Sequence, residues 1–173
     1  MKNNKKGFTL IELLAVIVIL AILVMLAIPA VTRYLNSARR NAFADNALRA
    51  IEAVRNDVIE NGFSSGTSIG TRPAGVSCNG GKCTYTITQI NELLEKKLDT
   101  SPYGEKYDCV IVVADQDAKT YTMTMIDKGN NGFKALTEDK INSGQDSDGN
   151  YIIRTNDSAL TCDTTSAPEQ TNP

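Results

Sequence analysis

The sequence predicts an α+β protein in which a long amino-terminal α-helix packs on a small antiparallel β-sheet. Leu, Ile and Val are concentrated before residue 32, and an amphipathic pattern of helical period follows them as far as Asn61-Gly62. The remainder is rich in Thr, Ser, Asn and Gly and contains short runs of β-branched residues. A chain of 173 residues has room for one globular domain and an extension.

The first predicted element is an apolar helix long enough to cross a membrane. The 24 residues Phe8–Val31 are interrupted only by Thr9, Glu12 and Pro29, and as a helix they extend ~36 Å. An ordinary signal peptide has a shorter apolar region, about 7–15 residues, and ends in a small-residue cleavage site that is missing here. A retained membrane helix is therefore favoured over an ordinary signal peptide.

Basic residues flank this helix on both sides. They are Lys2, Lys5 and Lys6 before it and Arg33, Arg39 and Arg40 after it. The lysines lie closer to the apolar run and the α-amino group adds to their charge, which favours an orientation with the amino end in the cytoplasm.

The helix is expected to continue beyond the membrane as an amphipathic one. Apolar residues recur at steps of three to five, namely Val31, Tyr34, Leu35, Ala38, Ala42, Ala47, Ile51, Val54 and Val58. The charged residues between them, Asp57 included, are predicted to form the exposed face. A helix from Thr9 to Glu60 has 52 residues and a length of ~78 Å. Pro29 lacks an N–H and leaves the carbonyl of Met25 without its helical partner, so a kink is expected there.

The globular part is expected to begin with a loop over residues 63–83, which are dense in Gly, Ser and Thr. A short helix is predicted at Gln89–Leu98, where Ile and Leu share one face and Thr88 is the N-cap. The expected strands are Tyr107–Ala114, Lys119–Asp127 and Asn150–Arg154, with Phe133–Leu136 as a candidate for a fourth. The first two are predicted to form an antiparallel hairpin through a turn at residues 115–118.

Composition argues against nucleic-acid binding and against catalysis. The net charge is −2, and without the three lysines of residues 1–7 there are 15 bases against 20 acids, so the body of the chain has no basic surface for a phosphate backbone. The absence of His removes the usual general base and the commonest zinc ligand. The sequence also lacks a nucleophile elbow and a Gly-rich phosphate loop, and we expect neither enzyme activity nor a cofactor.

The carboxylate of Glu12 lies at the front of an apolar run, where a lone charge is costly in lipid. Thr9 and Glu12 have the T-x-x-E spacing of a capping box, in which each side chain bonds the backbone of the other residue in the first turn of a helix. The alternative is that Glu12 pairs with a cation from another copy of the chain.

The segment Lys5-Lys6-Gly7-Phe8-Thr9-Leu10-Ile11-Glu12 resembles the processing site of type IV prepilins and the related pseudopilins, over roughly residues 5–35. The resemblance implies cleavage between Gly7 and Phe8 by a membrane aspartyl peptidase, since a side chain at position 7 would obstruct the peptidase, and methylation of the new Phe8 amino group. It also implies that Glu12 neutralises the Phe8 amino group of a neighbouring subunit, and that Pro29 lets the helix melt locally in a filament.

The same resemblance implies a type IV pilin, a subunit that polymerises with copies of itself. Its partners would be prepilin peptidase and the pilus assembly machinery, in the cytoplasmic membrane before assembly and in a surface pilus afterwards, with adhesion, motility and biofilm formation as roles. The corresponding segments are a leader at 1–7, a transmembrane and filament-core helix at 8–31, an amphipathic helix at 32–61, and the loop, sheet and tail at 62–173. The alternatives are a pseudopilin of a type II secretion or competence system and, from another class, a membrane-anchored enzyme or receptor.

The chain has four cysteines, and an even number in an exported protein favours disulfides. Of the three pairings, Cys78–Cys83 with Cys109–Cys162 is favoured. A Gly-rich turn closes the first, and the second would tie the tail to a strand, as the carboxy-terminal disulfide loop does in many pilins. Zinc ligation and reduced thiols are the alternatives.

Asp146, Asp148 and Asn150 offer oxygens at alternate positions, as calcium loops do. However, Tyr151 stands where an EF-hand has Gly, and Asp157 stands where it has Glu. A solvated turn is therefore favoured over a calcium site.

Overall fold

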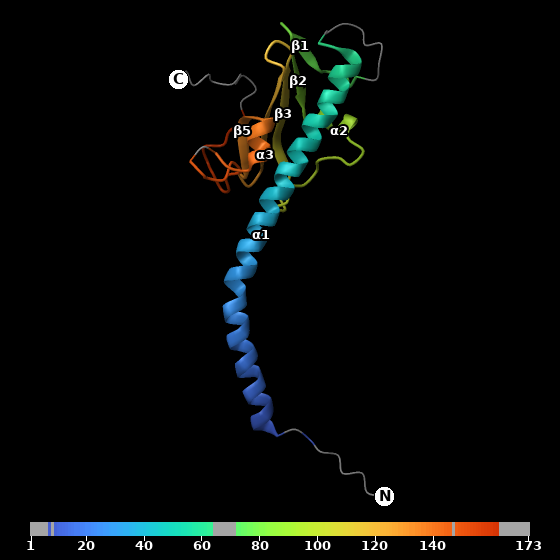
Figure 1. The fold of residues 1–173 in the computed structure, drawn as a ribbon. Coiled ribbons are helices and arrows are strands. Elements are labelled where there is room, and N and C mark those ends of the chain that lie inside the picture. Colours follow the sequence, from blue (N-terminus) through green and yellow to red (C-terminus); the bar gives the residue numbers. More distant parts are fainter. Residues whose placement is uncertain (1–6, 8, 64–71, 147, 163–173) are drawn as a thin grey trace, which may run out of the picture. The chain divides into compact units, whose positions relative to one another are not determined.

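The computed structural model describes residues 7, 9–63, 72–146 and 148–162. The chain divides into two compact units, residues 1–38 and residues 39–173. Helix α1, Leu10–Asn61, has 52 residues and contributes to both units (Figure 1). The predicted long helix is thus confirmed, displaced by one residue from the predicted bounds. Pro29 lies inside it.

The second unit contains a five-stranded antiparallel sheet in the order β1-β2-β3-β4-β5, so that each strand pairs with its neighbour in sequence (Figure 1). The strands are β1 Ser77–Asn79, β2 Lys82–Thr86, β3 Tyr107–Asp115, β4 Thr120–Asp127 and β5 Gly132–Thr137. Two short helices complete the unit, α2 Ile87–Leu93 and α3 Glu138–Ser143. A long helix packed on a small antiparallel sheet is the predicted α+β fold class.

The main core lies between the second half of α1 and one face of the sheet. The buried apolar residues of α1 are Phe43, Ala47, Ala50, Ile51, Val54 and Val58. Val110, Val112 and Ala114 of β3 belong to the same core, because alternate residues of a strand face the same side. The ring of Phe43 contacts Tyr107 edge-on, with centroids 5.7 Å apart. Phe43 was absent from the predicted apolar stripe, although it is fully buried.

A smaller apolar cluster covers the opposite face of the sheet. It consists of Cys109, Ile111, Ile126 and Leu160, each less than a tenth exposed, with Val113 packed beside them. Cys109 and Ile111 alternate along β3 with the residues that face α1, which places them on the other side. Leu160 belongs to the tail, so the tail crosses this outer face.

The predicted loop over residues 63–83 is wrong for its last third, because β1 and the start of β2 form a hairpin there. The two strands are joined by Gly80 and Gly81, whose φ angles of 56° and 74° are those of a tight two-residue hairpin turn. Residues 64–71 of the predicted loop lie outside the described residues.

Two further predictions are corrected. The predicted helix Gln89–Leu98 begins earlier, because the side chain of Gln89 accepts the Thr86 N–H at 2.8 Å and makes Thr86, not Thr88, the N-cap. It also ends earlier, at Leu93, because the backbone of Leu94 is extended. The predicted strand Asn150–Arg154 forms only isolated bridges. Ile152 and Ile153 are both buried, a consecutive pattern that a strand with one face in the core does not have.

The remaining strands follow the prediction. Tyr107–Ala114 and Lys119–Asp127 correspond to β3 and β4, and Phe133–Leu136 lies within β5. Strands β3 and β4 pair antiparallel, with Asp115 opposite Thr120 across the predicted turn.

Candidate functional site

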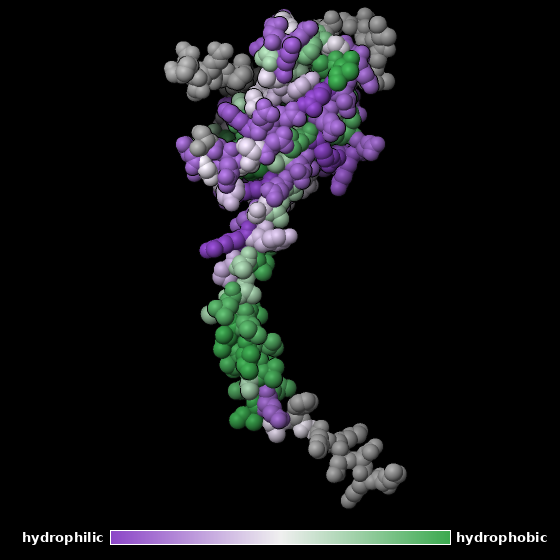
Figure 2. Space-filling view, viewed as in Figure 1, coloured by the Kyte–Doolittle hydropathy of each residue, from purple (hydrophilic) through white to green (hydrophobic). Residues whose placement is uncertain are grey.

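The first half of α1 presents apolar side chains on all its sides. Between Leu10 and Val31 the large apolar side chains are between 50% and 85% exposed, and Figure 2 shows them as one continuous hydrophobic band. By length and composition α1 is able to cross a membrane. A surface of this extent needs lipid or other protein to cover it, because monomeric soluble proteins rarely expose apolar patches of this size.

At the start of α1, Thr9 and Glu12 form the predicted capping box. The Glu12 Oε2 atom accepts the Thr9 N–H at 2.8 Å and the Thr9 hydroxyl at 2.9 Å, and the Glu12 N–H points back at the Thr9 hydroxyl at 3.4 Å. These bonds satisfy donors at the first turn and place a negative charge at the helix amino end, where the dipole favours it. Within a single chain, Thr9 is thus the partner of the Glu12 carboxylate.

Gly7 is exposed, and a Cβ built on it would meet nothing within 4 Å. Packing against the part of the chain that the structure describes therefore does not require glycine at this position. Phe8 and the lysines of residues 1–6 lie outside the described residues.

Pro29 occupies the interior of α1, where it donates no hydrogen bond to the carbonyl of Met25. The helix continues through it, and the Thr32 hydroxyl donates to the Ile28 carbonyl at 2.9 Å one turn further on. A hydroxyl that bonds its own helix in this way has no need of an outside partner, which suits an apolar surrounding.

The four cysteines form Cys78–Cys83 and Cys109–Cys162, the pairing favoured from the sequence. Cys78 and Cys83 lie directly opposite each other in the β1–β2 hairpin, with their Cα atoms 4.1 Å apart. Cys162 joins the tail to Cys109 on the outer face of β3, with a Cα separation of 5.5 Å. The first bond thus joins the two strands of one hairpin, and the second ties the tail to the sheet.

Asp57, predicted on the exposed face of α1, is instead buried in the globular unit, and this prediction is corrected. Its Oδ2 atom accepts the Arg72 Nε–H at 2.9 Å and the Tyr85 hydroxyl at 2.6 Å, while Asn61 donates to Oδ1 at 3.1 Å. Burial, reinforced by the hydrogen bond to Asp57, raises the pKa of Tyr85 far above its usual value. Helical periodicity places Asp57 on the charged face of α1 and does not indicate that a distant arginine compensates the carboxylate and allows its burial.

The calcium candidate at residues 146–150 forms a turn in which the Asp146 carboxylate accepts backbone N–H groups of the same turn. The Asp146 Oδ1 atom accepts the backbone N–H groups of Asp148 at 3.0 Å and Asn150 at 2.8 Å. These bonds, that of Asn150 first, lower the pKa of Asp146. No group of three or more His, Cys, Asp or Glu side chains that could hold a metal occurs among the residues that the structure describes.

The family described as the prokaryotic N-terminal methylation motif matches residues 2–28. The match contains Gly7, Phe8 and Glu12 and ends one residue before Pro29. No solved structure matches the chain. The segment that carries the motif is also the one whose apolar side chains α1 leaves uncovered. The chain thus bears, in its amino-terminal segment, the signature of the type IV pilins and pseudopilins.

Proposed function

We propose that this protein is the structural subunit of a type IV pilus. It is made as a precursor, cleaved between Gly7 and Phe8 by prepilin peptidase, methylated on Phe8, and polymerised through residues 8–31. The observation that carries the proposal is the methylation motif at residues 2–28 on a helix whose apolar side chains are exposed all round.

Exposure on every side of the helix fits both stages of the proposal, because lipid can cover these side chains before assembly and other copies of the helix can cover them afterwards. A helix that packs on a single partner needs only one apolar face, whereas a helix in the middle of a bundle of copies is apolar all round. Residues 32–61 and 62–173 would then form the outward part of each subunit. Before assembly the same helix would lie in the cytoplasmic membrane with its amino end inside.

Glu12 is assigned a pairing role in the polymer. A carboxylate in a dry bundle is tolerated only when a cation compensates it. Cleavage after Gly7 would create an amino group on Phe8, four residues before Glu12, and a neighbouring subunit could present that group to the carboxylate. The exposed position of Glu12 in the single chain leaves it accessible to such a neighbour.

The pairing role predicts that Glu12→Ala is processed at Gly7–Phe8 but fails to assemble. Mass spectrometry of the amino terminus measures processing, and electron microscopy of sheared filaments measures assembly. Glu52→Ala is the matched control, because Glu52 is an exposed carboxylate on the second half of α1. We expect filaments from Glu52→Ala and at least a tenfold loss from Glu12→Ala. Normal filaments from Glu12→Ala would contradict the pairing role, and an intact leader on the native chain would contradict the whole proposal.

The motif is shared with the pseudopilins, so a subunit of a type II secretion or competence system is the second candidate. Imaging of the cell surface separates the two. Long surface filaments that label with an antibody against the globular unit support the pilus. Chains that are processed at Gly7–Phe8 but form no filament beyond the cell envelope support the pseudopilin.

A further inference from the structure

The apolar band of α1 is bounded by one charged residue at each end. Residues 13–32 contain no ionisable side chain, while Glu12 precedes them and Arg33 follows them. Twenty helical residues rise ~30 Å, which is the thickness of a bilayer's hydrocarbon core. With α1 in a membrane, the Arg33 side chain would therefore lie at the headgroup level on the exported side.

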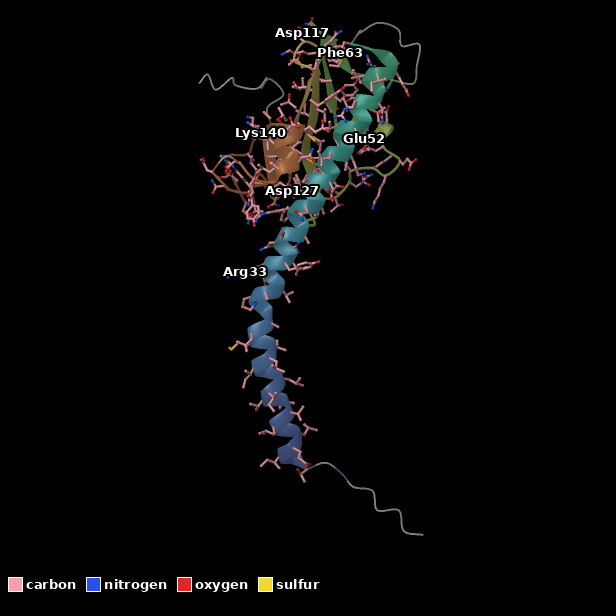
Figure 3. The ribbon with its side chains drawn as sticks, viewed as in Figure 1. Arg33, Glu52, Phe63, Asp117, Asp127 and Lys140 are labelled. Atoms are coloured by element: carbon pink, nitrogen blue, oxygen red, sulfur yellow. A yellow bond between two sulfur atoms is a disulfide. The ribbon has the colours of Figure 1, made fainter. Side chains whose placement is uncertain are left out.

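Arg33 has no acidic partner among the residues that the structure describes. No Asp or Glu occurs between Glu12 and Asp45. Arg33 is exposed, it projects from α1 in Figure 3, and it forms none of the four ion pairs found among residues 9–63, 72–146 and 148–162. The guanidinium is therefore available to a partner from outside the chain, and its paired N–H donors match the geometry of a phosphate.

Tyr34, next to Arg33, is a second residue suited to the membrane–water interface. It is 74% exposed and directly follows Arg33, just beyond the apolar band. Tyr is enriched at membrane–water interfaces because its ring is apolar and its hydroxyl is polar. An aromatic ring and a long basic side chain together form the usual boundary between a membrane helix and water.

We propose that Arg33 and Tyr34 form an interfacial anchor on the exported side of the membrane, in which Arg33 binds the phosphate of an acidic phospholipid. The anchor fixes the depth of α1 before the subunit enters a filament. This inference rests on the proposed membrane stage of the protein, but it does not depend on polymerisation. The partner is a lipid rather than a protein because the spacing places Arg33 at headgroup height whether or not another subunit is present.

A single tryptophan introduced at the interface tests the anchor. The chain contains no Trp, so Tyr34→Trp in the full-length protein gives one unambiguous fluorophore and keeps an interfacial aromatic residue. The protein is reconstituted in vesicles of phosphatidylcholine, with or without phosphatidylglycerol. Quenching by lipids brominated near the headgroup is compared with quenching by lipids brominated near the chain ends.

Arg33→Gln and Arg49→Gln are then made in the same background. Arg49 is the control because it is an exposed arginine of the same helix, 16 residues further along the chain.

We expect headgroup-level quenching to dominate and to increase when phosphatidylglycerol is present. Arg33→Gln should lose that increase, and Arg49→Gln should keep it. Equal quenching with and without phosphatidylglycerol, or an unchanged lipid effect in Arg33→Gln, overturns the anchor while the proposed pilus function stands. Absence of bromolipid quenching in every variant overturns both, since α1 would then not be in the bilayer. Unchanged quenching in Arg33→Gln together with a loss of filaments would also overturn the anchor, and would assign Arg33 to a contact between subunits.

Discussion

At the scale of single residues, Asp57 is the most consequential position in the globular unit. Its carboxylate and the Arg72 guanidinium are both almost fully buried, with side chains 2% and 9% exposed, and the Tyr85 hydroxyl completes the cluster. A buried ion pair of this kind adds little stability compared with apolar residues in its place. Removal of one partner, however, leaves the other charge buried and unpaired. The cluster also fixes the first described residue after the 64–71 segment to the end of α1, because Arg72 donates to the Gly62 carbonyl at 2.5 Å.

Asp57→Ala is therefore expected to destabilise the protein by about 3–5 kcal/mol, because it leaves the Arg72 guanidinium buried without its carboxylate. Urea unfolding of the full-length chain in detergent, followed by tyrosine fluorescence, measures the change. Asp45→Ala is the control, since Asp45 is an exposed acid on the same helix, and its effect should stay within about 0.5 kcal/mol. Similar unfolding midpoints for the two variants would mean that the cluster is not a structural requirement.

At the scale of elements, the β3–β4 hairpin is closed by one acid at the end of β3. The Asp115 Oδ1 atom accepts the N–H groups of Asp117 and Ala118, each at 3.1 Å, and Oδ2 lies 2.9 Å from the Lys82 ammonium on the neighbouring strand β2. The bond from Ala118 and then that from Lys82 hold the pKa of Asp115 below its usual value. One side chain thus joins the turn to the adjacent hairpin.

This geometry predicts a defined loss of stability in acid. Because the folded-state pKa is lowered, the stability that Asp115 contributes is complete above its ordinary value of about 4 and disappears as the pH falls through the folded-state pKa. Asp115→Asn should flatten the dependence of the urea midpoint on pH in that range. Lys82→Met removes only the ion pair and should retain part of the slope. An acid slope that is the same in wild type and Asp115→Asn would show that the turn carboxylate does not govern it.

Much of the element pattern could be predicted from the sequence because it rests on periodicity. The 52 residues of α1 and the alternation of β4 are both visible in the order of apolar side chains. The β1–β2 hairpin was missed because the Gly-rich composition around it resembles a loop, although Gly80-Gly81 between paired strands is the turn such a hairpin needs. The β-branched Ile152 and Ile153 favour a strand at residues 150–154, yet tertiary contacts in the core, rather than a strand ladder, hold both side chains.

The methylation motif could be predicted from the sequence alone. Its residues are contiguous in the sequence, so the order of Gly7, Phe8 and Glu12 is itself the signal, and the family match lies on that segment. Asp57 illustrates the opposite case. Its partners Arg72 and Tyr85 are 15 and 28 residues away, and no local pattern indicates which distant base will meet a given acid.

At the scale of the whole molecule, the two disulfides stabilise different parts of the globular unit. Cys78–Cys83 closes a separation of 5 residues within one hairpin, whereas Cys109–Cys162 closes a separation of 53 and carries the tail across the outer face of the sheet. Leu160, two residues before the second bond, packs on Ile111 and Ile126. The longer loop restricts the unfolded chain more, and its bond also retains an apolar cluster.

Removal of each disulfide as a pair of alanines should therefore rank the two bonds. On the chain-entropy account, Cys109→Ala with Cys162→Ala costs about 4 kcal/mol and Cys78→Ala with Cys83→Ala about 2 kcal/mol. Paired replacement leaves no free thiol, so each double variant serves as the control for the other in urea unfolding. Limited proteolysis adds a local reading: the tail around Leu160 should be cut faster only in the Cys109/Cys162 variant, because only that bond pins it to β3. If the two variants unfold at the same urea concentration and the tail resists protease in both, then packing of Leu160 on the sheet, rather than the covalent bond, retains the tail.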